Sequence, residues 1–128
     1  MRLLLDTHIL MWAASGSDLL SARAREMLKS PNTERLFSTV NLWEVAIKSN
    51  LGRADFNIDV SNLRGLALHN GYQELPITID HIVFLASLPR NHKDPFDRML
   101  IAQAKSENLT LMTSDKTVAS YGSNIVRV

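Results

Sequence analysis

The sequence predicts an α/β fold with a mainly parallel sheet, built as a single domain over residues 1–128. Short, continuous apolar runs typical of strands buried on both faces alternate with longer stretches of helical spacing, and this alternation is typical of a parallel sheet covered by helices. The five Gly and four Pro are scattered between these stretches, with no linker, internal repeat or low-complexity tract. A length of 128 residues suits one ordinary domain with its own core.

The first elements are a strand and two helices. The apolar run at 3–5 predicts a buried strand, and helical spacing follows over 7–14. A second helix is expected over 21–30, because Ser21 is a suitable N-terminal cap and Pro31 stands just past the end.

The middle of the chain begins with a second strand and a third helix. The run at 35–39 predicts the strand. Apolar spacing typical of a helix covers 40–51 and ends at Gly52, a common C-terminal signal. The segment 53–75 is the least regular part of the sequence, and we expect one helix in it near 62–69.

The last part of the chain predicts two helices and two strands. Helical spacing over 79–88 stops at a proline. A further helix is expected over 95–108, because Asp94 and the proline after it are typical of a helix start. The runs at 109–112 and 125–128 predict the two strands.

Composition excludes several classes of function. The 14 Lys plus Arg against 13 Asp plus Glu give a formal charge of +1, which argues against a polybasic nucleic-acid binder and against an acidic mimic of nucleic acid. The absence of Cys excludes disulfides, zinc ribbons, thiol catalysis and iron–sulfur clusters. No apolar run approaches the roughly 20 residues that span a bilayer, and the apolar run before Asp6 is too short for a signal peptide. We therefore expect a soluble cytoplasmic protein without a membrane segment.

Polar side chains follow three of the predicted strands. They are Asp6 and Thr7 after the first strand, Ser38 and Thr39 in and after the second, and Thr113, Ser114 and Asp115 after the run at 109–112. Ligands of parallel sheets bind at the edge formed by the carboxyl ends of the strands. Short polar side chains and carboxylates are therefore expected to converge on that edge.

Two further carboxylates lie inside apolar helical stripes. Glu44 falls within the stripe of the helix over 40–51, and Asp97 falls within the stripe of the helix over 95–108. The stripes are Val40, Trp43, Ile47 and Leu51 in the first helix, and Leu100, Ile101 and Ala104 in the second. A carboxylate aimed at the interior is costly unless a cation or several donors neutralise it, so both residues are candidates for a functional site.

Asp6, Glu44, Asp97 and Asp115 together form an oxygen-only ligand set. Oxygen ligands suit Mg²⁺ or Mn²⁺ and not zinc. Such a site can bind one or two hard cations and clamp a phosphodiester. Without a metal the four carboxylates would repel one another, so at least one is expected to titrate above its ordinary value.

At these residues the chain resembles a PIN domain, and within that group the VapC toxin ribonucleases of bacterial type II toxin–antitoxin pairs. Four segments carry the resemblance in order and spacing, and together with the length they cover nearly the whole chain. They are LLDTH at 4–8, STVNLWEVAIK at 38–48, HKDPFDRMLIAQA at 92–104 and TSD at 113–115.

The resemblance implies a three-layer α/β/α fold and a Mg²⁺-dependent endoribonuclease, dimeric and inhibited by a cognate antitoxin. Asp6, Glu44 and Asp97 match the core acids of the family, Asp115 matches the more variable fourth acid, and Thr113 matches a small hydroxyl position beside the site. The expected substrate is RNA, with structured or transfer RNA as an option. The segment 53–75 matches no motif of the family.

Structural alternatives exist for the acids themselves. Asp6 and Asp115 are also suitable helix caps. Asp97 is the third residue of its helix, where an acid can belong to a capping box, and we assign the metal to Asp97 and the cap to Asp94 because Asp97 faces inward. Glu44 stands four residues before Lys48, so the pair can form a surface ion pair instead.

Other polar residues are assigned supporting or binding roles. Thr7, Asp94 and Thr113 are expected to hydrogen-bond to the metal ligands. Lys48 and Arg98 are candidates for contacts to RNA phosphates, and His92 is a candidate for a substrate contact.

Two functions compete with a ribonuclease. The first is a PIN-like module that binds RNA or a protein but catalyses no reaction. The presence of all four acids argues against this function. The second is a receiver or phosphatase with an aspartyl nucleophile, which needs a second acid near the first. Thr7 and His8 follow Asp6 instead.

Overall fold

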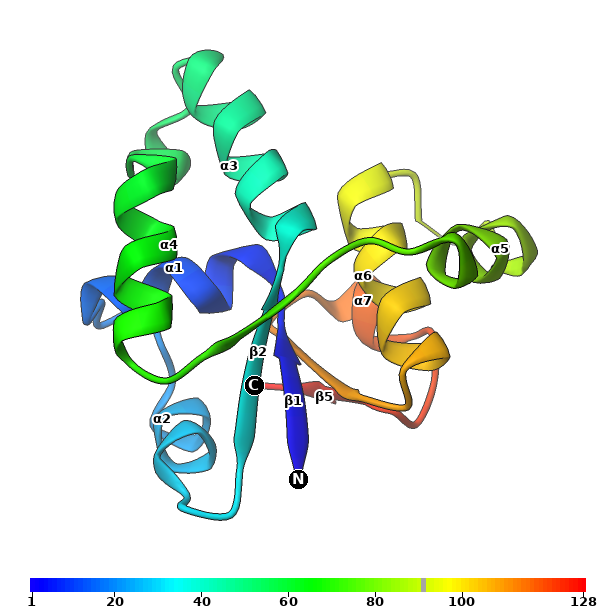
Figure 1. The fold of residues 1–128 in the computed structure, drawn as a ribbon, viewed down its shortest axis with the longest axis horizontal. Coiled ribbons are helices and arrows are strands. Elements are labelled where there is room, and N and C mark those ends of the chain that lie inside the picture. Colours follow the sequence, from blue (N-terminus) through cyan, green and yellow to red (C-terminus); the bar gives the residue numbers. More distant parts are fainter. Residues whose placement is uncertain (91) are drawn as a thin grey trace.

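A computed structural model describes residues 1–90 and 92–128. In this part of the chain five strands form one sheet in the order β3-β2-β1-β4-β5, and every neighbouring pair is parallel (Figure 1). The strands are β1 (Arg2–Leu5), β2 (Glu34–Ser38), β3 (Gln73–Leu75), β4 (Thr110–Thr113) and β5 (Ile125–Arg127). The predicted α/β fold with a parallel sheet is confirmed.

Seven α-helices and a 3₁₀ turn connect these strands within the described residues. The helices are α1 (Thr7–Ser15), α2 (Ala22–Lys29), α3 (Thr39–Asn50), α4 (Val60–His69), α5 (Ile79–Ser87), α6 (Pro95–Ser106) and α7 (Lys116–Ala119), and the 3₁₀ turn is η1 (Ala54–Phe56). The longest of them have 12 residues. Among residues 1–90 and 92–128, no helix combines the length and apolarity that crossing a bilayer requires.

The core consists of two apolar clusters, one on each face of the sheet. Successive side chains of a strand point to opposite faces, so Leu3 and Leu5 of β1 belong to one cluster and Leu4 to the other. The first cluster packs α1, α2 and α4 against the sheet, and the second packs α6 and α7. Figure 1 shows these helices on the two sides of the strands. This arrangement is the three-layer α/β/α architecture.

Side-chain caps explain where the helices begin. Ser21 accepts a hydrogen bond from the backbone N–H of Ala24, as expected for the cap of α2. Asp94 caps α6 with Pro95 at its first position, as the sequence predicts. Asp6 and Asp115 cap α1 and α7, so the structural alternative considered for these two acids is realised.

Several predicted boundaries shift, and three short elements were missed. The second strand ends at Ser38 and not at residue 39, because Ser38 and Asn41 form a capping box that starts α3 at Thr39. The segment 53–75 contains η1 and β3 besides α4, and α7 follows Asp115. These elements have three or four residues, which is too short for a periodic pattern.

Of the apolar stripe predicted for the third helix, Val40 is buried in the core, but the other three residues are not. Trp43 is 53% exposed, Ile47 39% and Leu51 72%. The buried face of α3 is instead formed by Val40, Asn41, Glu44 and Val45. The reason is that α3 starts at the end of β2 and extends beyond the sheet, so only part of its surface meets the two clusters (Figure 1).

Candidate active site at the carboxyl edge of the sheet

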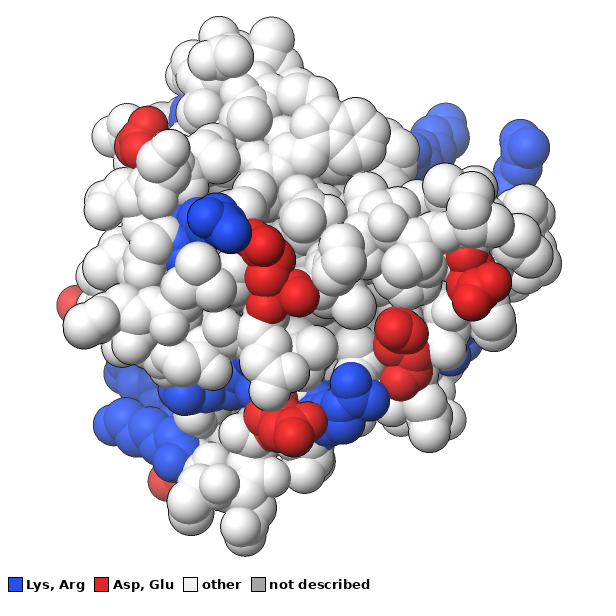
Figure 2. Space-filling model, viewed as in Figure 1, with Lys and Arg blue, Asp and Glu red and all other residues white. Residues whose placement is uncertain are grey.

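An acidic cavity of about 430 Å³ lies where the carboxyl ends of the central strands meet the starts of the helices. Its lining includes all four acids predicted from the sequence. The lining residues are Asp6, Thr7, His8, Glu44, Lys48, Arg53, His92, Asp94, Asp97, Ser114 and Asp115. On the molecular face shown in Figure 2, by contrast, acidic and basic side chains are dispersed over a mostly uncharged surface.

Asp6 is fixed by two hydrogen bonds directly after β1. Its Oδ1 accepts from the backbone N–H of Ile9 at 3.0 Å, and its Oδ2 accepts from the hydroxyl of Thr113 at 2.5 Å. The side chain is only 6% exposed. Burial raises the pKa of Asp6, the hydrogen bonds from Thr113 and Ile9 oppose this effect, and the nearby charge of Glu44 adds to it.

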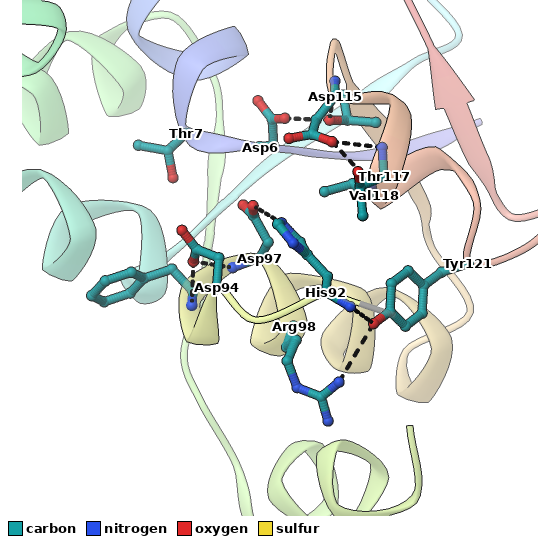
Figure 3. A network of polar contacts seen from close by, with 12 residues as sticks. Asp6, Thr7, His92, Asp94, Asp97, Arg98, Asp115, Thr117, Val118 and Tyr121 are labelled. Carbon is teal, nitrogen blue, oxygen red and sulfur yellow. Dashed lines mark hydrogen bonds and ion pairs between the residues drawn. The ribbon is translucent and has the colours of Figure 1, made fainter. Parts of the chain in front are cut away.

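Thr113 connects Asp6 to Asp115 through hydrogen bonds. The hydroxyl that donates to Asp6 also accepts the backbone N–H of Asp115 at 3.0 Å. Asp115 in turn accepts from the backbone N–H groups of Thr117 and Val118 through Oδ1, which caps α7 (Figure 3). Thr113 is fully buried, so this hydroxyl links Asp6 and the backbone of Asp115 away from solvent.

Glu44 lies buried in the cavity wall and is held by two donors. Its Oε1 accepts from the hydroxyl of Thr7 at 2.5 Å, and its Oε2 accepts from the ammonium of Lys48 at 2.5 Å. The amide of Asn41 donates to the same Thr7 hydroxyl at 3.0 Å and to the carbonyl of Leu5 at 3.2 Å. Asn41 was missed from the sequence, although its capping-box spacing to the end of β2 is a usable signal.

Lys48 contacts a second carboxylate as well. Its Nζ lies 3.4 Å from Asp94 Oδ2. Burial alone would lower the pKa of Lys48, but the hydrogen bond and charge of Glu44, followed by those of Asp94, outweigh it and raise the pKa. The ammonium therefore stays charged at neutral pH.

Asp97 projects from the first turn of α6 toward the centre of the cavity (Figure 3). His92 Nε2 lies 2.7 Å from Asp97 Oδ2, and Asp94 Oδ1 accepts the backbone N–H groups of Phe96 and Asp97. Burial raises the pKa of Asp97 to about 6, with the charges of Asp94, Glu44 and Asp6 adding to the shift and the His92 contact opposing it. This agrees with the expectation that crowded carboxylates titrate high.

The closest group of metal-ligand atoms consists of His92, Asp97 and Asp115. One ligand atom from each of these residues lies within 4.8 Å of the other two. A divalent cation fits this donor set, since two carboxylates provide hard oxygen ligands and an imidazole is accepted by Mn²⁺. His92 was expected as a substrate contact only, because its spacing from Asp97 is that of no familiar ligand motif.

The two basic residues predicted for RNA binding are placed differently. Lys48 lines the acidic cavity, as does Arg53, which the sequence did not single out. Arg98 lines a neighbouring hollow of about 380 Å³ with Arg90, His92 and Lys93. There it donates to the carbonyl of Pro89 at 2.8 Å and to the hydroxyl of Tyr121 at 3.4 Å.

Comparisons with known proteins agree with this architecture. A family model described as PIN domain matches residues 3–123. No curated protein matches the sequence.

Three solved structures share the fold. A chain of VapBC2 from Rickettsia felis, solved bound to a promoter DNA fragment, is 16% identical with a TM-score of 0.69, covering 100% of this chain and 98% of that one. A chain of a toxin–antitoxin complex from Klebsiella pneumoniae is 20% identical with a TM-score of 0.63, covering 96% of this chain and 94% of that one. A chain of VapBC-1 from nontypeable Haemophilus influenzae is 16% identical with a TM-score of 0.62, covering 99% of this chain and 98% of that one. At these identities the likeness establishes the fold.

Proposed function

The chain belongs to the PIN domain family, and from this premise we propose that the acidic cavity is the active site of a metal-dependent nuclease that hydrolyses phosphodiester bonds in RNA. One observation carries the proposal. Asp6, Asp97 and Asp115 follow or begin three separate elements and line one cavity together with His92, and one ligand atom each of His92, Asp97 and Asp115 lies within 4.8 Å of the other two.

The cation proposed for this site is Mg²⁺ or Mn²⁺. When bound, it supplies positive charge to the phosphate and acidity to the attacking water. His92, Asp97 and Asp115 would hold it, and Asp6 adds a further carboxylate to the same cavity lining. Glu44 contributes its charge to the same cavity, where Thr7 and Lys48 orient it.

The residues around the acids position the reaction. Thr113 positions Asp6 relative to the backbone of Asp115 by hydrogen-bonding to both. Asp94 fixes the helical turn that carries Asp97. Arg53 lines the cavity, so we assign it the contact to a phosphate flanking the cleaved bond. Lys48, the basic side chain of the lining that the sequence predicts to bind RNA, is engaged by Glu44 and Asp94 instead. Arg98, in the neighbouring hollow, is placed to contact a phosphate further along the strand.

The proposed substrate is single-stranded or looped RNA, including loops of structured or transfer RNA. In such regions the backbone is accessible and can enter a narrow cavity, whereas a regular duplex presents a wide, stiff surface. The near-neutral overall charge of the chain is consistent with a small number of phosphate contacts.

We further propose that the protein is the toxin of a type II toxin–antitoxin pair, acting in the cytoplasm as a homodimer and inhibited by a cognate antitoxin. The structurally similar chains from Rickettsia felis, Klebsiella pneumoniae and Haemophilus influenzae belong to toxin–antitoxin complexes, which supports this role.

The nuclease is tested with the purified protein. RNA should be cleaved when Mg²⁺ or Mn²⁺ is added and left intact with a chelator, and Asp6→Asn or Asp97→Asn should reduce the rate at least about 100-fold. Variants that cleave as fast as the parent would contradict the site. RNA binding without cleavage by the parent would favour a non-catalytic PIN-like module instead.

The toxin role is tested in a bacterial host. Induction of the parent chain alone should arrest growth, and induction of Asp97→Asn at the same level should not. A parent chain without effect on growth would contradict the role while leaving the nuclease standing.

A further inference from the structure

The ammonium of Lys48 has four close neighbours inside the acidic cavity. Its ammonium contacts Glu44 Oε2 at 2.5 Å and Asp94 Oδ2 at 3.4 Å. It also lies 4.9 Å from the ring centre of Phe56 and 5.6 Å from that of Phe96. The side chain is only 15% exposed. A lysine on a solvated helix face has no such set of neighbours, so the surface ion pair considered from the sequence does not describe it.

The carboxylates of the cavity divide into two groups around this ammonium. Glu44 and Asp94 contact Lys48, and their remaining oxygens are engaged by Thr7 and by the backbone N–H groups at the start of α6. For Asp6, Asp97 and Asp115, no Lys or Arg within the described residues lies within 4.0 Å of a carboxylate oxygen. The first group of carboxylates thus shares a cation of the protein itself, and the second group does not.

The Lys48 ammonium therefore disfavours a divalent ion beside Glu44 and Asp94. Ions of a two-metal site lie about 3.5–4 Å apart and are bridged or flanked by shared carboxylates. Here a second ion that used Glu44 or Asp94 as a ligand would lie next to the Lys48 ammonium, which already contacts both. The second metal ion and the Lys48 ammonium would both be positively charged, and neighbouring like charges repel strongly in a partly buried site.

We propose that Lys48 is the resident cation of this cavity, which takes the place of a second metal ion, so that the protein binds one divalent ion, at the end formed by His92, Asp97 and Asp115. This inference rests on the metal-binding part of the proposed function. Lys48 is a positioning residue in this scheme: it orients Glu44 and Asp94 and restricts the stoichiometry.

The test is the number of Mn²⁺ ions bound per chain, measured on metal-free protein by titration calorimetry and by electron paramagnetic resonance. The parent should bind one ion. Lys48→Met keeps the length of the side chain and removes its charge, so it should bind two, with spin coupling between neighbouring Mn²⁺ ions. Lys48→Arg restores a cation and should return the count to one.

A second arm avoids any loss of folding in the Lys48 variants. Crystals of the parent soaked in Mn²⁺ should show one anomalous peak beside His92, Asp97 and Asp115, with the Lys48 ammonium still between Glu44 and Asp94. Glu44→Gln should still bind one ion, whereas Asp97→Asn should weaken binding by at least about tenfold.

The outcomes separate this inference from the nuclease proposal. Two ions in the parent, or one ion in a folded Lys48→Met protein, would overturn the role of Lys48 and leave a metal-dependent nuclease intact. No Mn²⁺ binding by the parent would overturn both.

Discussion

Asp97 is the residue whose chemistry depends most on its surroundings. It is buried beside three other acids, which raises its pKa to about 6 in the folded protein, against 3.8 in the absence of these effects. Its contact with His92 opposes the shift without cancelling it. A carboxyl group with these properties exchanges a proton for a metal ion in the neutral range.

The raised pKa of Asp97 predicts how the stability of the metal-free protein depends on pH. Between about pH 4 and 6 the folded chain binds more protons at Asp97 than the unfolded chain, so the free energy of unfolding should rise as pH falls through 6. Between pH 7.5 and 5.5 the gain is on the order of 0.8 kcal/mol. It is measured by urea unfolding with a chelator at pH 7.5 and 5.5. Asp97→Asn should lose this part of the dependence, and an identical slope in both proteins would refute it.

His92 predicts the metal preference of the site. Its imidazole is the one nitrogen donor in the group with Asp97 and Asp115, and nitrogen ligands favour Mn²⁺ over Mg²⁺. Mn²⁺ should therefore bind more tightly than Mg²⁺, and His92→Asn should weaken Mn²⁺ binding more than Mg²⁺ binding. Competition calorimetry measures both. Equal losses for the two metals would show that His92 does not contact the ion.

The sequence leads to the acids of the cavity more readily than to their partners. Asp6 and Asp115 follow strands, and that position alone places them at the sheet edge. Glu44 was correctly expected to face inward, but the stripe used as the reason is largely exposed. His92 and Arg53 lie in irregular segments, where no periodicity relates a residue to its neighbours in space.

At the level of elements, some acids of the cavity also serve as N-terminal caps of helices. Asp6 and Asp115 each use one oxygen to hold the first turn of a helix, and Asp94 does so beside Asp97. A carboxylate at a helix N-terminus is stabilised by the free N–H groups and by the dipole of the helix. The starts of α1, α6 and α7 thus help to keep acids together that would otherwise repel one another (Figure 3).

Thr113 at the end of β4 predicts a measurable loss of stability. Thr113→Val keeps the shape of the side chain but removes the donor to Asp6 and the acceptor for the N–H of Asp115. Unfolding by urea should show a cost of about 1–3 kcal/mol, and RNA cleavage should slow. Thr113→Ser keeps the hydroxyl and serves as the control. A fully stable and active Thr113→Val protein would argue against the proposed support of Asp6.

Element length decides which parts of the fold are predictable. The apolar runs of β1 and β4 and the capped starts of α2 and α6 are visible in the sequence, and all four elements are present. The edge strand β3 has three residues with no buried apolar side chain among them, so nothing in its pattern marks it. It is defined by pairing with β2, which is information from the folded chain.

For the whole molecule, the cavity predicts that metal binding and folding are coupled. The acids meet only in the native state, so Mn²⁺ binds the folded chain and not the unfolded one. At a concentration 100 times the dissociation constant it should add about 2.7 kcal/mol to the free energy of unfolding. Thermal melting with and without Mn²⁺ measures the effect, and Asp97→Asn should show little of it. An unchanged melting temperature of the parent would contradict specific binding.

The hydrogen bond between Thr113 and Asp6 joins residues that are 107 positions apart. During synthesis on the ribosome, β1 cannot complete its pairing until β4 emerges, because the strand that pairs with it on that side is translated only after α6. A growing chain carries separated acids and no assembled cavity until that strand has emerged. The order of elements along the chain thus delays the assembly of the cavity until β4 has been translated.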